Sequence, residues 1–198
     1  MILQFLPSLE DSKKMAKSTA SRVLYAVHQG TYVLKLIGDI RVTCCAALDE
    51  FIESVFKDPK LTAVVVDLSE TTIIDSTALG LIAKIAVFFR KSFDIKPVII
   101  STNPDITRIL DSMGFEAVFN IIHEAPVIET MMADVSDRPC TEAYATQKVL
   151  EAHQILMGMN DKNAETFKDV VATLQEQEAS MANASCSDRS DSQRHISK

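Results

Sequence analysis

One short segment of the chain combines residue types that could carry chemistry. A continuous β-branched run, Val64-Val65-Val66, is followed a few residues later by Asp75 and Ser76. The run suits a central strand covered on both faces, and the apolar periodicity after Ser76 predicts a helix that begins there. A serine hydroxyl at a helix start can cap free backbone N–H groups. The same position can also hold a phosphate, because the N–H groups and the helix dipole attract anions.

Both interpretations of Ser76 remain open on these residues alone. A phosphate on Ser76 would add about -1.5 to -2 units of charge beside Asp75. The fold could tolerate that modification while the surface around it changed sharply.

Acidic residues are expected near the same end of the sheet as Ser76. A solvated acidic rim is the favoured interpretation, and a metal site is the alternative. The four histidines have no metal-ligand spacing, so no metal is predicted. The acids are Asp39, Asp67, Glu70 and Asp75, and the histidines are His28, His123, His153 and His195.

Motifs typical of enzymes are absent from the sequence. There is no Gly-x-x-x-x-Gly-Lys loop, no Gly-x-Gly-x-x-Gly fingerprint and no Gly-x-Ser-x-Gly elbow. With only five glycines, a phosphate-cradling loop is not expected. We therefore predict a binding protein without catalytic residues or cofactors.

Composition narrows the partners and the compartment. The formal net charge of -7 argues against nucleic-acid and anionic membrane surfaces. The most apolar stretch, residues 78–89, contains Lys84 and is shorter than the ~20 residues of a membrane span. We expect a cytoplasmic protein with plain thiols, since the cysteines lack Cys-x-x-Cys spacing. They are Cys44, Cys45, Cys140 and Cys186.

The elements that must position Ser76 form an alternating series. An opening hairpin turns at Gln29-Gly30, and the order thereafter alternates between helices and strands. This order predicts an α/β fold in which about four helices pack on a mixed β-sheet. The expected strands are 22–28, 32–37, 61–68, 96–101 and 116–122. The expected helices are 43–56, 78–92, 103–114 and 125–135, and 69–72 is expected to be a polar loop.

The chain divides into four expected parts. Residues 18–135 form the domain, and 1–17 a partly disordered segment in which Met15 competes with Met1 as the start. Residues 136–179 form a helical extension, either a hairpin or a kinked helix, and 180–198 a disordered tail. The extension could pack back on the domain or bind a second protein. The apolar helix 78–89 could meet this extension, a partner or a second copy.

The segment Asp75-Ser76-Thr77-Ala78-Leu79-Gly80 resembles the Asp-Ser-Ser/Thr-Gly-Leu-Gly signature of STAS domains. The resemblance covers the element order over residues 18–135, and Asn103-Pro104 and Met113-Gly114-Phe115 look like the later part of the family pattern. The family comprises bacterial anti-sigma factor antagonists and the cytoplasmic domains of anion transporters. The resemblance thus implies a STAS fold.

The antagonist branch implies a phosphorylation switch in transcription regulation. Ser76 maps to the phosphoacceptor, with Thr77 as a secondary candidate. The partners would be an anti-sigma factor with serine kinase activity and a serine phosphatase. The unphosphorylated protein would bind the anti-sigma factor and release sigma. The partner-binding residues implied are Asp39, Arg41, Asp75, Ser76, Thr77, Ala78 and Leu79.

The sequence departs from the family pattern at two positions. Ala78 replaces a usual glycine, and Gly38-Asp39-Ile40-Arg41 stands where Gly-Glu-Leu-Asp is common. Two other functions are possible. One is a STAS scaffold or ligand-binding module in which Ser76 is only a helix cap. The other is a receiver domain using Asp67, which is disfavoured because paired acids and a late lysine are missing.

Overall fold

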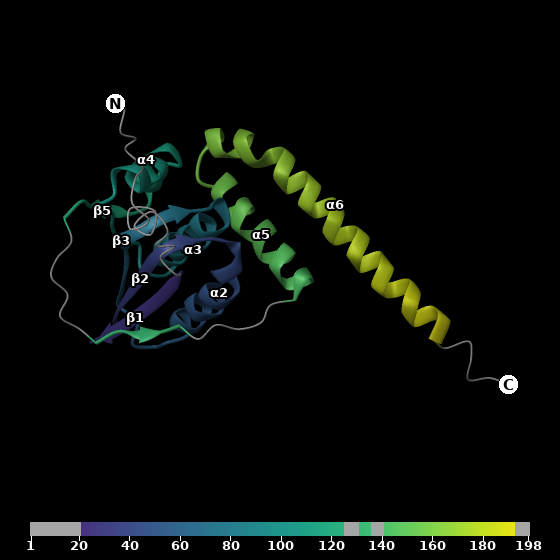
Figure 1. Ribbon diagram of the computed structural model, residues 1–198, viewed down its shortest axis with the longest axis horizontal. Helices are drawn as coiled ribbons and strands as arrows, with labels where there is room; N and C mark the ends of the chain where they lie inside the picture. The colour runs from purple at the N-terminus through teal and green to yellow at the C-terminus, as the bar shows by residue number, and fades with distance from the viewer. Residues whose placement is uncertain (1–20, 125–130, 136–140, 193–198) are drawn as a thin grey trace, which may run out of the picture.

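The computed structural model describes residues 21–124, 131–135 and 141–192, with side chains as far as Ser180. Strands and helices alternate through the first part, and two helices follow (Figure 1). The strands are β1 (Arg22–His28), β2 (Thr31–Ile40), β3 (Ala63–Ile74), β4 (Val98–Ile100), β5 (Asn120–Ile122) and β6 (Ala133–Asp134). The helices are α2 (Val42–Phe56), α3 (Ser76–Ser92), α4 (Pro104–Ser112), α5 (Glu142–Met157) and α6 (Asp161–Ser192), with the 3₁₀ turn η1 (Phe115–Ala117).

The described strands form one mixed sheet in the order β5-β4-β3-β2-β1-β6. β2 to β5 run parallel, while β1 pairs antiparallel with β2 and with β6. Gln29 and Gly30 both have positive φ, at 49° and 81°, which is the turn geometry that suits a two-residue hairpin. The predicted α/β fold with an antiparallel opening hairpin is confirmed.

The core is mainly aliphatic, includes the buried rings of Phe89, Phe115 and Phe119, and centres on β2, β3 and α3. The alternation in β2 buries Leu34 and Leu36, and the apolar run of β3 buries Val66 and Leu68. α3 is buried on several faces, as its all-round apolar sequence predicts. The two elements that flank Ser76 are therefore both anchored in the core.

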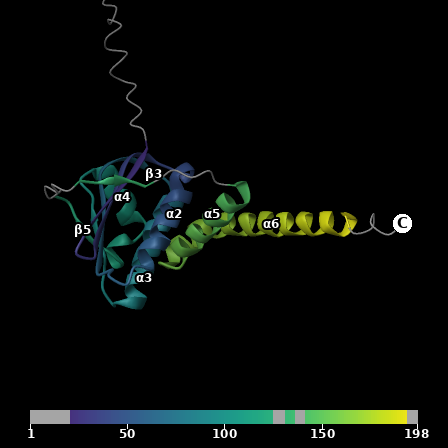
Figure 2. The same ribbon diagram turned by 90° about the horizontal axis from the view of Figure 1, so that it is seen from below.

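Three layers follow one another across the molecule. α2 and α3 pack side by side on the sheet, and α5 lies over both of them (Figure 2). α6 returns along α5 and then projects past the domain (Figure 1). Within the described residues, no helix has the length and apolar character needed to cross a membrane.

The predicted loop at 69–72 is wrong, because β3 continues through it to Ile74. Parallel pairing with β2 extends along this stretch, with two register shifts at which β3 contains one more residue than β2. Thr71 is buried and its hydroxyl donates to the carbonyl of Leu36 at 2.8 Å. A polar side chain thus satisfies a backbone acceptor inside the sheet, which polarity alone does not reveal.

Two other elements differ from the prediction. The strand expected at 116–122 is the turn η1 followed by the short strand β5. Of the helix expected at 125–135, Ala133–Asp134 is instead strand β6, which covers the free edge of β1. An ion pair between Arg22 and Asp134 at 2.9 Å supports this pairing. Residues 125–130 of that predicted helix lie outside the described residues.

The end of the chain also differs from expectation. The sequence predicted a tail without regular structure from residue 180, whereas the backbone of α6 continues to Ser192. The prediction was based on the small number of apolar residues after residue 180. A helix can nevertheless form there, because it satisfies its own backbone hydrogen bonds without being buried. The predictions for residues 1–17 and 193–198 fall outside the described residues.

Candidate functional site

One carboxylate organises the start of α3. Asp75 has an extended backbone, and its Oδ1 accepts from the N–H of Ala78 at 2.9 Å. Its Oδ2 accepts from the N–H of Val42, at the start of α2, at 2.7 Å. Asp75 therefore caps two helices, because β2 and β3 end side by side and each feeds a helix. The alternative in which Ser76 is the helix cap is wrong: a carboxylate one residue earlier takes that role.

The hydroxyl of Ser76 is directed to a different element. Its Oγ lies 2.9 Å from Nε2 of His153 on α5. The other ring nitrogen, Nδ1, lies 2.7 Å from the carbonyl of Val149. A carbonyl can only accept, so Nδ1 donates, and in the neutral ring Nε2 accepts from the Ser76 hydroxyl. His153 is 5% exposed and stands edge-on to Phe167.

The seven predicted partner-binding residues differ in their accessibility. Asp39 and Arg41 are solvent-accessible, with a 3.6 Å ion pair between them. Asp75 and Ser76 are half-buried. The remaining three, Thr77, Ala78 and Leu79, are buried by the chain itself. The replacement of glycine by Ala78 thus falls on an interior position, since Ala78 is 0% exposed.

The predicted acidic residues do not form a continuous open rim. Lys35 lies 3.2 Å from Asp67 and 2.8 Å from Glu70. Burial lowers the pKa of Lys35, but hydrogen bonds to Glu70 and Asp67 outweigh that effect and raise it. Asp39 accepts from the hydroxyl of Thr72. Among the described residues, no group of His, Cys, Asp and Glu is arranged to hold a metal ion.

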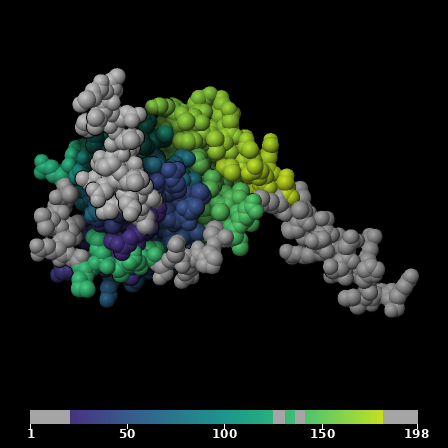
Figure 3. Space-filling model, viewed as in Figure 1, coloured from purple at the N-terminus to yellow at the C-terminus, as the bar shows by residue number. Residues whose placement is uncertain are grey.

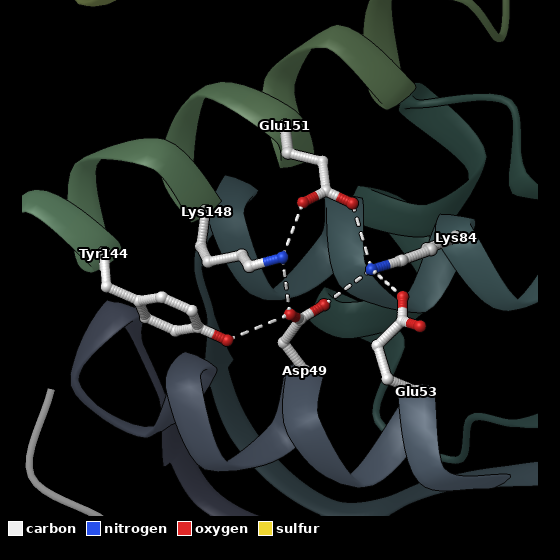
Figure 4. Close-up of polar contacts among 6 residues, drawn as sticks. All are labelled: Asp49, Glu53, Lys84, Tyr144, Lys148 and Glu151. Carbon is white, nitrogen blue, oxygen red and sulfur yellow. Dashed lines mark hydrogen bonds and ion pairs between the residues drawn. The ribbon is translucent and has the colours of Figure 1, made fainter. Parts of the chain in front are cut away.

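An ionic cluster around the buried Asp49 joins α5 to the domain (Figure 4). Asp49 of α2 is 1% exposed, and its two oxygens each lie 2.8 Å from a lysine, Lys84 of α3 and Lys148 of α5. Glu151 of α5 lies 2.9 Å from Lys84 and 2.8 Å from Lys148. Glu53 pairs with Lys84 at 2.6 Å, and the hydroxyl of Tyr144 donates to Asp49 at 3.4 Å. We call these six residues the joint cluster.

The cluster shifts the pKa values of Asp49, Glu151, Lys84 and Lys148 toward their charged forms. Burial raises the pKa of Asp49, but hydrogen bonds from Lys148 and Lys84 outweigh it and lower that pKa. The pKa of Glu151 is lowered by the same two lysines against the same opposing effect. Burial lowers the pKa of Lys84, and its three carboxylate partners raise it well above the usual range. Asp49, Glu151, Lys84 and Lys148 are therefore charged at neutral pH.

A glycine lets α5 approach α3 closely. A Cβ atom added to Gly80 would lie 2.4 Å from the carbonyl oxygen of Ala152 and 2.6 Å from its Cα. Real side chains do not tolerate backbone atoms at that separation. Gly80 thus belongs to the contact with α5, one turn after Ser76.

The α5–α6 turn is fixed to the opposite end of the domain. The amides of Asn160 and Asn163 both donate to the carbonyl of Met113, at 3.1 and 3.0 Å. Asn163 also donates to the carbonyl of Leu156 at 3.1 Å. In the space-filling view, the described part of the hairpin lies against the domain surface (Figure 3).

Sequence reasoning did not assign His153 or the joint cluster. Two members of the joint cluster could have been found from the sequence. Asp49 interrupts the apolar stripe of α2, and Lys84 interrupts that of α3. Buried charges are retained only with partners, so two such interruptions could have predicted a pair. His153 likewise stands in the apolar stripe of α5, but its partner could not be identified because it lies 77 positions away.

Comparison with known proteins agrees with this architecture. The family model described as STAS domain matches residues 22–130, more than half of the chain. The chain belongs to the STAS domain family. In a comparison with curated protein sequences, no match was found.

Two of the solved structures that match this chain are anti-sigma factor antagonists. One is an anti-sigma factor antagonist from Mycobacterium paratuberculosis, with 23% identity and a TM-score of 0.45, covering 52% of this chain and 85% of the other. The second is the anti-sigma factor antagonist SpoIIAA in its unphosphorylated form, with 13% identity and a TM-score of 0.44, covering 54% and 90%.

Proposed function

We propose that this STAS protein is an anti-sigma factor antagonist of the cytoplasm, switched by phosphorylation of Ser76. In its unphosphorylated form it binds an anti-sigma factor with serine kinase activity and thereby releases sigma. Phosphorylation of Ser76 ends that binding, and a serine phosphatase restores it. The protein is a substrate in this cycle and has no catalytic role of its own.

One observation supports Ser76 above the other hydroxyl groups. It occupies the first position of α3, where Asp75 already performs the capping. Its hydroxyl is therefore not required by the helix, and a phosphate there would experience the favourable end of the helix dipole. The neighbouring Thr77 is 5% exposed and packs into the interior, so Ser76 is the better phosphoacceptor.

Two accessible residues extend the proposed contact surface. Asp39 and Arg41 lie where β2 leads into α2, and Asp75 reaches the same place by its hydrogen bond to Val42. A phosphate on Ser76 would add negative charge beside Asp75. We expect that charge to repel a partner whose surface is complementary to the unmodified site.

The test uses the full-length chain with each anti-sigma factor kinase of the same organism. We expect Ser76→Ala to remain bound to one of them in the presence of ATP, and Ser76→Glu to bind at least about tenfold more weakly, a loss of about 1.4 kcal/mol. Ser54 is an exposed serine on α2, so Ser54→Ala and Ser54→Glu are matched controls. Mass spectrometry should find the phosphate on Ser76. If both Ser76 variants bind every kinase like the parent, the proposal is wrong.

The alternative is a STAS scaffold or ligand-binding module without a phosphorylation switch. It predicts that no kinase of the organism modifies the chain and that Ser76→Ala changes no partner binding. The same pair of measurements therefore decides between the two functions.

A further inference from the structure

We propose that α5 is an intramolecular cover for the phosphorylation site, and that it competes with the anti-sigma partner for the same surface. This inference rests on the proposed function, and it adds the regulation of that site. The closed form is the one described above. In the open form, α5 leaves α3 and the hydroxyl of Ser76 becomes accessible.

The first argument is the position of the reacting atom. A kinase must bring the γ-phosphate of ATP in line with the attacking oxygen. The Oγ of Ser76 instead faces Nε2 of His153 at 2.9 Å, and His153 is itself buried. A phosphoryl group cannot occupy the space of the imidazole. Because the half-buried hydroxyl is directed at α5, we infer that transfer to Ser76 requires this helix to move.

The second argument is the extent of the covered surface. α5 contacts both α2 and α3, and its backbone at Ala152 lies directly against Gly80. Gly80 follows Thr77, Ala78 and Leu79, which the family resemblance assigns to partner binding. A protein that docks on the first turns of α3 would meet α5 before it met α3.

The third argument is the chemistry of the joint. Three carboxylates and two ammonium groups join the helices at the joint cluster. Charged groups are rehydrated when such a contact opens, whereas the opening of a purely apolar contact would expose an aggregation-prone surface. The charged part of the joint can thus be rehydrated when α5 moves, while Leu150, Ala152 and Leu156 of α5 lose apolar contacts.

The hairpin has a separate attachment that can act as a pivot. Asn160 and Asn163 hold the α5–α6 turn on the carbonyl of Met113, away from Ser76. Leu156 is buried in the core near this end, whereas Phe167 stands edge-on to His153. We expect α5 to swing away from α3 while this end stays attached.

Coupling of this kind is reciprocal. If the closed cover reduces access of the kinase and partner to Ser76, then the bound partner or the phosphate reduces closure by the same factor. The phosphate adds up to two negative charges next to Asp75 and has no room beside His153. Phosphorylated protein should therefore have a displaced α5.

Gly80→Ala is a selective way to open the cover. Alanine is a better helix former than glycine by about 1 kcal/mol, so α3 itself should not suffer. Its Cβ would collide with the backbone of Ala152. Gly158→Ala is the matched control, because the added Cβ there lies 3.4 Å from the nearest atom, an ordinary contact. Lys148→Glu opens the joint independently, by placing a third carboxylate against Asp49 and Glu151.

Accessibility is measured first, without any partner. Ser76→Cys is placed in each background, and alkylation of the introduced thiol by iodoacetamide is followed by mass spectrometry of the peptide that contains position 76. Hydrogen exchange of residues 142–157 is measured on the same full-length chains. We expect Gly80→Ala and Lys148→Glu to accelerate both by at least about tenfold, and Gly158→Ala to match the parent.

The rate of phosphorylation is measured next. The kinase used is the anti-sigma factor that stays bound to the Ser76→Ala variant in the test of the proposed function. The opened variants should be phosphorylated at least about tenfold faster than the parent and Gly158→Ala. Equal rates in all four chains would overturn the cover while leaving the phosphorylation switch intact. Faster alkylation without phosphorylation of any chain would support the cover and overturn the proposed function. Equal alkylation and equal exchange in all four chains would overturn the cover by themselves.

Discussion

The interior of the sheet domain and the joint between α3 and α5 are both buried, yet they are built from different residues. The interior places aliphatic side chains such as Leu36, Val66 and Ile82 against one another, each essentially unexposed. The joint brings together Asp49 and Lys148, a glycine and a histidine that pairs with Ser76. Apolar contact stabilises in proportion to area and tolerates small shifts, whereas ion pairs and a close backbone contact require one geometry.

This difference shows how one chain can hold a permanent domain and a removable helix. Buried ion pairs add little net stability, because desolvation offsets most of the Coulomb attraction. They penalise every arrangement that leaves a charge buried and unpaired. The joint therefore defines where α5 sits without binding it as strongly as the interior binds the strands.

The largest expected effect comes from breaking the interior. Leu36 is 0% exposed on the central strand β2, and Leu36→Ala should reduce the free energy of unfolding by about 4 kcal/mol through lost apolar contact and a cavity. Chemical denaturation measures this loss. Hydrogen-exchange protection should fall in the strands and in α5 together. A loss confined to α5 would contradict the assignment of Leu36 to the permanent core.

A smaller effect, confined to one element, is expected from breaking the joint. Asp49→Ala removes the carboxylate between Lys84 and Lys148, and it should reduce the free energy of opening α5 by about 3 kcal/mol. Exchange protection should fall in α5 while β2 and β3 keep theirs. Glu116→Ala, at an exposed acid of η1, is the control. Equal loss of protection in the strands would show that joint and interior are one cooperative unit.

The smallest expected effect is a dependence on pH of the contact between α5 and the domain. The carboxyl groups of Asp49 and Glu151 have a pKa below their ordinary values of 3.8 and 4.5 in the folded protein. Their contribution is present above those ordinary values and is lost as pH falls through the lowered ones. α5 should therefore open in acid, below about pH 4, before the aliphatic interior yields.

The lysines of the joint cluster predict that α5 also loses stability at high pH. The pKa values of Lys84 and Lys148 are raised from 10.5, so their contribution is complete below that value and is lost as pH rises through the raised values. Hydrogen exchange or near-ultraviolet circular dichroism across this range, corrected for intrinsic rates, measures both losses. Asp49→Ala should show the opened α5 already at neutral pH. Protection of α5 that stayed constant from neutral to acid pH would refute the role of the cluster.

Most of the fold could be predicted because its causes are local. Patterns of a few adjacent residues are enough to predict the Gln29-Gly30 turn, the strand before Asp67 and the helix α3. Predictions failed where a local pattern was overridden by a neighbour in space. Thr71 looks like a loop residue until Leu36 supplies a buried acceptor, and Ala133 joins a strand only because β1 has a free edge.

The candidate site shows the same division. The sequence by itself determined that Asp75 and Ser76 begin a helix after a buried strand, and its family signature selected Ser76 as the phosphoacceptor candidate. Only the tertiary structure decided that Asp75 is the cap, that Ser76 meets His153, and that α5 lies across both. The reason is physical. A strand or helix follows from the periodicity of adjacent residues, but a hydrogen bond between positions 77 apart in the chain depends on how the finished elements pack.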